Sequence, residues 1–150
     1  MNDFRSRLVI KIGEGSHRRV YQHPDDPGLV VKVPRKAQPS RLYNYLEWWI
    51  WQRLKGTPDE PLLAPCVACA PDYSWIVMER VEITHQSFHD KNNHKDRRDW
   101  MDDIKANNCG IKDDRLVLLD YGSKRTAKRL GIPLEIRKPA NSKGSRGGNR

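Results

Sequence analysis

Apolar positions at the start of the chain fall into short alternating runs. Residues 8–12 (Leu-Val-Ile-Lys-Ile) end at Gly13-Glu14-Gly15, and residues 19–22 lead back from that turn. Residues 29–33 then follow a dense turn signal, His-Pro-Asp-Asp-Pro-Gly. Runs rich in β-branched residues between Gly and Pro clusters are typical of strands. The pattern therefore predicts a meander of three antiparallel strands.

The apolar spacing then changes to that of a helix. Ser40 stands where a helix N-cap belongs, and Gly56 stands where a helix should stop. The apolar positions at helical spacing are Leu42, Tyr45, Leu46, Trp49 and Ile50. Further apolar residues on the other faces predict a helix covered on several sides. Glu47 is the only acid within it, and a buried carboxylate needs a cationic partner or a large pKa shift.

The second half of the chain alternates between short apolar runs and polar stretches. Residues 65–70 and 74–81 are expected to form strands, and residues 84–99 are a polar, His-rich connector with room for one helix. Residues 100–108 are expected to form a loop. The run 116–119 predicts a buried strand ending at Asp120-Tyr121-Gly122, and residues 123–130 a short basic helix capped by Gly131. These elements together indicate an α+β fold.

The composition of the chain indicates the cellular compartment in which we expect it. The chain has 150 residues, 31% of them charged, which indicates one soluble domain. No run approaches the roughly 18 apolar residues that span a bilayer. The charged N-terminus lacks the apolar core of a secretory signal. Three cysteines, an odd number, do not make a disulfide framework. We therefore expect a cytoplasmic protein with no membrane partner.

The net charge of +9 is concentrated at the C-terminal end. Residues 123–150 carry nine Lys or Arg against one acid, Glu135, which gives +8, while residues 1–122 carry 19 basic and 18 acidic side chains, which gives +1. Residues 132–150 cannot bury enough apolar surface to order themselves, so we expect a basic disordered tail there. The segment 123–150 either promotes solubility or contacts an acidic partner or nucleic acid.

Two motifs near the N-terminus are candidates for phosphate chemistry. Gly13 and Gly15, followed by Val20, offer a turn whose backbone can approach phosphate groups closely. Lys32 lies in Val-Val-Lys-Val, and Glu47 on the next helix needs a cation. A plain hairpin would explain the glycines, and an exposed side chain is the ordinary state of a strand lysine. A buried pair between Lys32 and Glu47 would satisfy both side chains, and we predict that pair.

Two further motifs flank the last predicted strand. Residues 101–108 (Met-Asp-Asp-Ile-Lys-Ala-Asn-Asn) contain Asp103, Lys105 and Asn108. Asp120-Tyr121-Gly122 ends the strand. An acidic turn and an Asp-x-Gly turn are each common, so neither motif is specific by itself. Their order and spacing along the chain carry the argument.

Taken together, these motifs resemble those of protein kinases over about residues 8–122. They are similar to the glycine-rich loop G-x-G-x-x-G-x-V, the V-A-I-K strand, the H-R-D-x-x-x-x-N catalytic loop and the D-F-G triplet. Departures from the pattern include Arg18 at the third glycine, Met101 at the His, Asp102 at the Arg and Tyr121 at the Phe of the triplet. Within this superfamily the opening GEGSHRRVYQHPDDPGLVVKV is most similar to the small bacterial YrbL-type group and phage kinases.

The resemblance implies ATP and Mg²⁺ as cofactors and phosphate transfer to an alcohol, most simply by a minimal serine/threonine-type protein kinase. It implies a reduced two-lobed kinase-like fold over residues 1–131. An N-lobe of about 1–81 would hold an antiparallel sheet and one αC-like helix, and a truncated C-lobe would cover about 82–131. The implied roles are as follows: nucleotide cover from Gly13, Gly15 and Val20, phosphate grip from Lys32 fixed by Glu47, hinge contacts from Glu79 and Val81, general base Asp103, γ-phosphate contact Lys105, and metal ligands Asn108 and Asp120.

The chain also departs from the family in length. Only about twenty residues separate the hinge from the catalytic loop, and 28 residues follow Gly122, so the peptide-binding platform is expected to be missing or much reduced. Three interpretations remain open: a minimal protein kinase, a kinase of a small molecule, or a pseudokinase that binds ATP or a partner without catalysis.

One pattern favours a different class of protein. Cys66-x-x-Cys69 and His85-x-x-x-His89 fit a loose zinc-finger spacing, which together with the basic tail would suggest a nucleic-acid-binding protein. Residues 74–81 are strand-like until just before His85, whereas such a finger places its histidines on a helix. Buried cysteines and exposed histidines are the plainer explanation.

Overall fold

The computed structural model describes residues 4–37, 40–102 and 104–136. Its largest element is a five-stranded sheet in the order β1-β2-β3-β5-β4, and every neighbouring pair is antiparallel. The strands are β1 (Lys11–Glu14), β2 (Arg18–Gln22), β3 (Leu29–Pro34), β4 (Cys66–Cys69) and β5 (Ile76–Glu79). The predicted three-strand meander is confirmed as β1 to β3. The first strand begins at Lys11 rather than at residue 8, so the expected bounds 8–12 were wrong.

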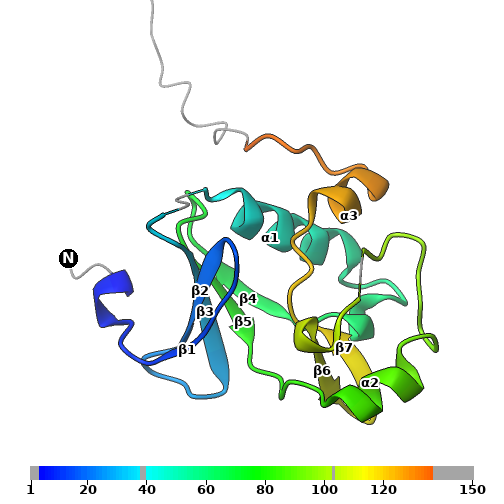
Figure 1. Cartoon of the computed structure of the whole chain (residues 1–150). Helices are drawn as coiled ribbons and strands as arrows, with labels where there is room; N and C mark the ends of the chain where they lie inside the picture. Colours follow the sequence, from blue (N-terminus) through cyan, green and yellow to red (C-terminus); the bar gives the residue numbers. More distant parts are fainter. Residues whose placement is uncertain (1–3, 38–39, 103, 137–150) are drawn as a thin grey trace, which may run out of the picture.

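Helix α1 (Leu42–Leu54) packs along the sheet, where it contacts β3 and β4 (Figure 1). It starts two residues after Ser40, whose Oγ accepts a hydrogen bond from the Leu42 amide, and it ends two residues before Gly56. Its apolar residues are buried on several sides, as the sequence predicts: Tyr45, Leu46, Ile50, Trp51 and Leu54. Among the described residues, no helix is long and apolar enough to cross a membrane.

The C-terminal part of the chain is built around a two-stranded hairpin (Figure 1). It holds α2 (Gln86–Asn92), a short 3-10 turn at Ala106–Asn108, β6 (Cys109–Lys112), β7 (Arg115–Leu118) and α3 (Lys124–Arg129). Two further 3-10 turns lie earlier in the chain, at Phe4–Arg7 and Glu60–Leu62. Asp113 and Asp114 connect β6 to β7 with φ angles of 52° and 58°, the conformation that suits a two-residue hairpin. The sequence analysis missed β6. It predicted β7 and α3 at nearly the observed bounds, and it allowed for one helix within residues 84–99, where α2 lies.

A close contact joins this hairpin to the segment that follows β5. The Ile111 amide donates to the Glu82 carbonyl at 3.0 Å, and the Thr84 amide donates to the Cys109 carbonyl at 2.9 Å. Gly110 lies between them, and a Cβ at this position would lie 2.6 Å from Val81 Cγ1. Glycine is therefore required here for packing, which explains why β6 carries a residue that normally weakens strands.

One hydrophobic core unites both parts of the chain. Leu46 and Ile50 of α1 share a cluster of buried residues with Trp100, Val117 and Tyr121 from the C-terminal part. Ile132 packs on the same core, and the hydroxyl of Tyr45 donates to the Pro133 carbonyl at 2.9 Å. The mixed α+β class is thus confirmed. Most of the predicted tail, residues 137–150, lies outside the described residues.

Candidate functional site

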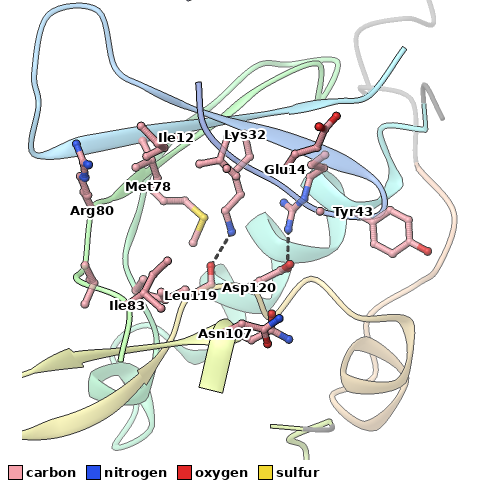
Figure 2. Close-up of a pocket in the computed structure, with 18 of the residues that line it drawn as sticks. Ile12, Glu14, Lys32, Tyr43, Met78, Arg80, Ile83, Asn107, Leu119 and Asp120 are labelled. Atoms are coloured by element: carbon pink, nitrogen blue, oxygen red, sulfur yellow. Dashed lines mark hydrogen bonds and ion pairs between the residues drawn. The ribbon is translucent and has the colours of Figure 1, made fainter. Parts of the chain in front are cut away.

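A cavity of about 1100 Å³ lies between the sheet and the C-terminal part of the chain. Figure 2 shows Lys32 descending from the sheet toward Leu119, with Met78 and Ile83 at one end and Tyr43 at the other. The apolar end follows β5 and the polar end lies beneath the β1–β2 turn. This volume lies just above the range of about 300–1,000 Å³ that is usual for small-molecule sites.

The predicted pair of Lys32 and Glu47 is confirmed as a contact. The Lys32 ammonium lies 2.7 Å from Glu47 Oε1, which joins β3 to α1. Glu47 is fully buried and Lys32 is 6% exposed. The ammonium also donates to the Leu119 carbonyl at 2.6 Å. Because β3 pairs antiparallel with β2 and β5 on either side, the lysine is fixed at the centre of the sheet.

Glu47 also holds the backbone that follows Asp120. Its Oε2 accepts hydrogen bonds from the amides of Tyr121 at 2.8 Å and Gly122 at 2.9 Å. Gly122 is required for this approach, because a Cβ there would lie 2.6 Å from the Tyr43 carbonyl. Burial opposes ionisation of Glu47, but the charges of Arg18 and Lys32 outweigh burial and lower its pKa from 4.5 to about 2. The carboxylate is therefore ionised at neutral pH.

Arg18 is a site residue that the sequence analysis missed. It occupies the place of the third glycine and is 5% exposed. Its guanidinium donates to Glu47 at 3.0 and 3.4 Å, to Asn44 Oδ1 at 3.1 Å and to Asp120 Oδ1 at 2.6 Å. Burial disfavours its charge, but Glu47 and Asp120 compensate, and the net effect raises its pKa. Arg18, Lys32, Glu47 and Asp120 thus form a four-charge cluster.

A signal for Arg18 was present in the sequence. Side chains two residues apart in a strand point to the same face, and Val20 was already expected to cover the site. Arg18 therefore had to face the same way as Val20. Asn44 was missed as well, although it is fully buried and donates to the carbonyls of Lys32 at 3.3 Å and Tyr73 at 2.9 Å.

The candidate metal ligands lie on the lower side of the cavity. Asp120 and Asn108 both line it, and the Leu119 amide donates to the Asn108 carbonyl at 2.8 Å, which joins the backbone at Asn108 to the residue before Asp120. The Asp120 side chain is 53% exposed, so one carboxylate oxygen remains accessible besides the one bound to Arg18. Lys105 also lines the cavity. Asp103, the predicted base, lies outside the described residues.

The remaining predicted residues line the cavity too. Gly13, Gly15 and Val20 come from β1, β2 and the turn between them, and Glu79 and Val81 from the segment at the end of β5. The Glu79 carboxylate binds Lys112 at 2.6 Å, and the Glu79 amide donates to the Pro65 carbonyl at 2.9 Å. Among the described residues, every predicted site residue lines this cavity except Glu47, which is buried behind it and contacts Lys32.

The donor set fits magnesium rather than a softer metal. Asp120 and Asn108 offer oxygen atoms only, and Mg²⁺ in phosphate-transfer sites is bound by one or two carboxylates together with substrate phosphates and water. The described residues contain no group of three or more His, Cys, Asp or Glu that would hold a metal without a ligand. A magnesium ion here would therefore depend on phosphate oxygens for part of its coordination.

The zinc alternative is not supported. Cys66, Cys69, His85 and His89 all lie in the described part of the chain, where they form no metal-binding group. Burial raises the pKa of the Cys66 and Cys69 thiols to about 12. Cys66 contacts the hydroxyl of Tyr121 at 3.3 Å, and His85 caps α2. The cysteines are core residues.

Comparison with known protein families finds no match for this chain, and comparison with curated proteins finds none either.

Proposed function

We propose that this chain is an ATP- and magnesium-dependent phosphotransferase with a reduced protein-kinase-like fold. The observation that carries the proposal is the buried Lys32–Glu47 pair at 2.7 Å, joined through Glu47 to the backbone after Asp120. Burying a lysine together with a helix carboxylate costs desolvation free energy. We therefore take the presence of this pair as support for a functional role of the lysine. Here it lies in a cavity large enough for a nucleotide.

The two ends of the cavity suit the two ends of ATP. Val20, Val30 and Met78 offer an apolar surface for the adenine ring at the β5 end. Among the described residues, no backbone hydrogen bond engages the Val81 amide, which leaves this donor for the base. The phosphates would lie beneath the β1–β2 turn. Lys32 uses two of its ammonium hydrogens for Glu47 and Leu119, so its third is available for a phosphate oxygen.

Asn108 and Asp120 would hold Mg²⁺, which supplies neutralisation of the charge on the transferring phosphate. We assign Asp103 the role of accepting the hydroxyl proton of the acceptor, and Lys105 that of contacting the γ-phosphate. The acceptor class we propose is a protein serine or threonine, with the basic segment 123–150 attracting an acidic partner. Transfer to a small molecule would use the same nucleotide site.

The second candidate is a pseudokinase, and one observation favours it. Asp120 is already paired with Arg18 at 2.6 Å, which takes up one of the carboxylate oxygens that a metal needs. Both candidates require nucleotide binding, and they differ in whether phosphate is transferred.

A thermal-shift titration tests the shared step. ATP with Mg²⁺ at 100 times its dissociation constant should stabilise the wild-type chain by about 2.7 kcal/mol. Lys32→Met should lose this stabilisation, whereas Lys55→Met, at an exposed lysine that does not line the cavity, should keep it. Wild type that is folded but gains no stability from ATP refutes both candidates.

Labelling with γ-phosphate-labelled ATP in a host lysate separates them. A phosphotransferase should label an acceptor, and Asp103→Ala and Asp120→Ala should each abolish the label. ATP binding without any labelled product decides for the pseudokinase.

A further inference from the structure

Arg18 bridges two carboxylates. One is that of Glu47, which fixes Lys32, and the other is that of Asp120, which faces the cavity. Arg18 lies at the start of β2, in the place of a glycine, and both of its terminal nitrogens are engaged. Its partners differ in their exposure to solvent. Glu47 and Asn44 are fully buried, whereas the side chain of Asp120 is 53% exposed. Of the contacts that Arg18 makes, the one to Asp120 is therefore the contact that an entering ligand could replace.

Exchange would leave the guanidinium in place. Without Asp120, Arg18 keeps two hydrogen bonds to Glu47 and one to Asn44. Arg18 and Asp120 line the same cavity, so the nitrogen released from Asp120 faces the space that a phosphate would fill. A phosphate oxygen is a strong acceptor for guanidinium, and such a charge-assisted bond would replace the lost one.

The charges of the cluster oppose metal binding in the absence of phosphate. Two cations, Arg18 and Lys32, balance two carboxylates, Glu47 and Asp120, so the net charge is zero. A divalent cation entering this cluster gains no net attraction and must compete with a guanidinium 2.6 Å from Asp120 Oδ1. Phosphate groups would supply the missing negative charge.

We propose that Arg18 is the resident counter-ion of Asp120 and keeps divalent cations off this carboxylate until a phosphate-bearing ligand enters the cavity. The proposal rests on the proposed function, because it takes the cavity as a nucleotide-phosphate site. Its consequence is coupled binding: metal alone binds weakly, phosphate binds to Arg18 and Lys32, and the two together bind tightly. Arg18 thus acts as a positioning residue that sets the order in which metal and nucleotide bind.

The test is a titration of the nucleotide-free full-length chain with Mn²⁺, monitored by the electron paramagnetic resonance of the free ion. Arg18→Gln removes the charge and should bind Mn²⁺ at least tenfold tighter than wild type. Arg18→Lys keeps the charge and should remain within threefold of wild type. The double variant Arg18→Gln/Asp120→Asn should return to the wild-type affinity. A folded Arg18→Gln protein that gains less than twofold overturns the proposal.

A second variant covers the case in which Arg18→Gln does not fold. Asp120 is half-exposed, so Asp120→Asn in the wild-type background is expected to fold. Arg18 already occupies this carboxylate, so the substitution should change nucleotide-free Mn²⁺ affinity by less than twofold. A loss of fivefold or more would show that Asp120 is open to metal despite Arg18, and that result overturns the proposal.

A separate titration measures Mn²⁺ binding in the presence of nucleotide. With a non-hydrolysable ATP analogue present, wild type should bind Mn²⁺ at least tenfold tighter than without it, and Asp120→Asn should lose most of that gain. If thermal shifts show that no nucleotide binds, the proposed function fails. The nucleotide-free titrations would still test whether Arg18 excludes metal from Asp120.

Discussion

Replacing Glu47 with Gln should reveal how much of the fold depends on one buried carboxylate. Glu47 accepts hydrogen bonds from Arg18, Lys32 and the amides of Tyr121 and Gly122. Glutamine keeps the shape but removes the charge, which leaves two buried cations without their shared partner. Breaking a buried ion pair in this way costs about 3–5 kcal/mol. That is a large part of the roughly 5–15 kcal/mol that stabilises an ordinary domain.

The pKa of Glu47 gives the magnitude and the pH window. It is lowered from 4.5 to about 2, so folding favours the ionised form. Stability from this group is fully present above pH 4.5 and is lost as the pH falls through about 2. By linkage it contributes about 3 kcal/mol at pH 7 and less than half of that at pH 3. A protonated Glu and a Gln are close in shape and charge, so the two proteins should converge in acid.

Urea unfolding of both proteins at pH 7, 4 and 3 measures this difference. The free energy of unfolding should differ by about 3 kcal/mol at pH 7 and by less than half of that at pH 3. Glu135→Gln, at an exposed position, serves as the control and should change stability by less than about 0.5 kcal/mol at each pH. A difference between wild type and Glu47→Gln that stays constant from pH 7 to pH 3 refutes the reasoning, because the charge would then not be the stabilising feature.

Two further predictions concern the packing around the site. Gly122→Ala should lower the free energy of unfolding by about 1–3 kcal/mol in the same urea titration, because its Cβ would lie 2.6 Å from the Tyr43 carbonyl. Gly15→Ala is the control, since a Cβ there would have nothing nearer than 3.9 Å, and it should change the free energy of unfolding by less than about 0.5 kcal/mol. Equal effects of the two substitutions would contradict the close approach to Tyr43 as the cause. Tyr121→Phe should cost about 1–3 kcal/mol in thermal unfolding, because the Ala64 carbonyl would lose the hydroxyl that donates to it at 2.7 Å; an unchanged melting temperature would show that this bond contributes nothing.

The sequence predicted those contacts in which one residue requires a partner of a particular charge. Glu47 is the only acid on an apolar helix, and Lys32 lies on the strand before it, so their pairing could be expected before any coordinates. Strand β6 escaped notice because the reason for Gly110 is tertiary: the glycine makes room for Val81 from a segment about thirty residues earlier. Arg18 was not predicted because its partners Glu47, Asn44 and Asp120 lie far away in the sequence, so the glycine pattern alone gives no reason for a buried cation at this position.

The position of Arg18 changes how the site is held together. Protein kinases control the lysine–glutamate pair by moving the helix that carries the glutamate. Here a displacement of α1 would separate Glu47 from Arg18 and Lys32 and from two backbone amides at once. At about 3–5 kcal/mol for breaking the buried pair alone, fewer than roughly one molecule in a hundred would have α1 displaced. The lysine is therefore positioned by the core of the domain before any ligand arrives. The half-exposed contact between Arg18 and Asp120 is the weaker connection in the cluster, so control by ligands is expected to act there rather than on α1.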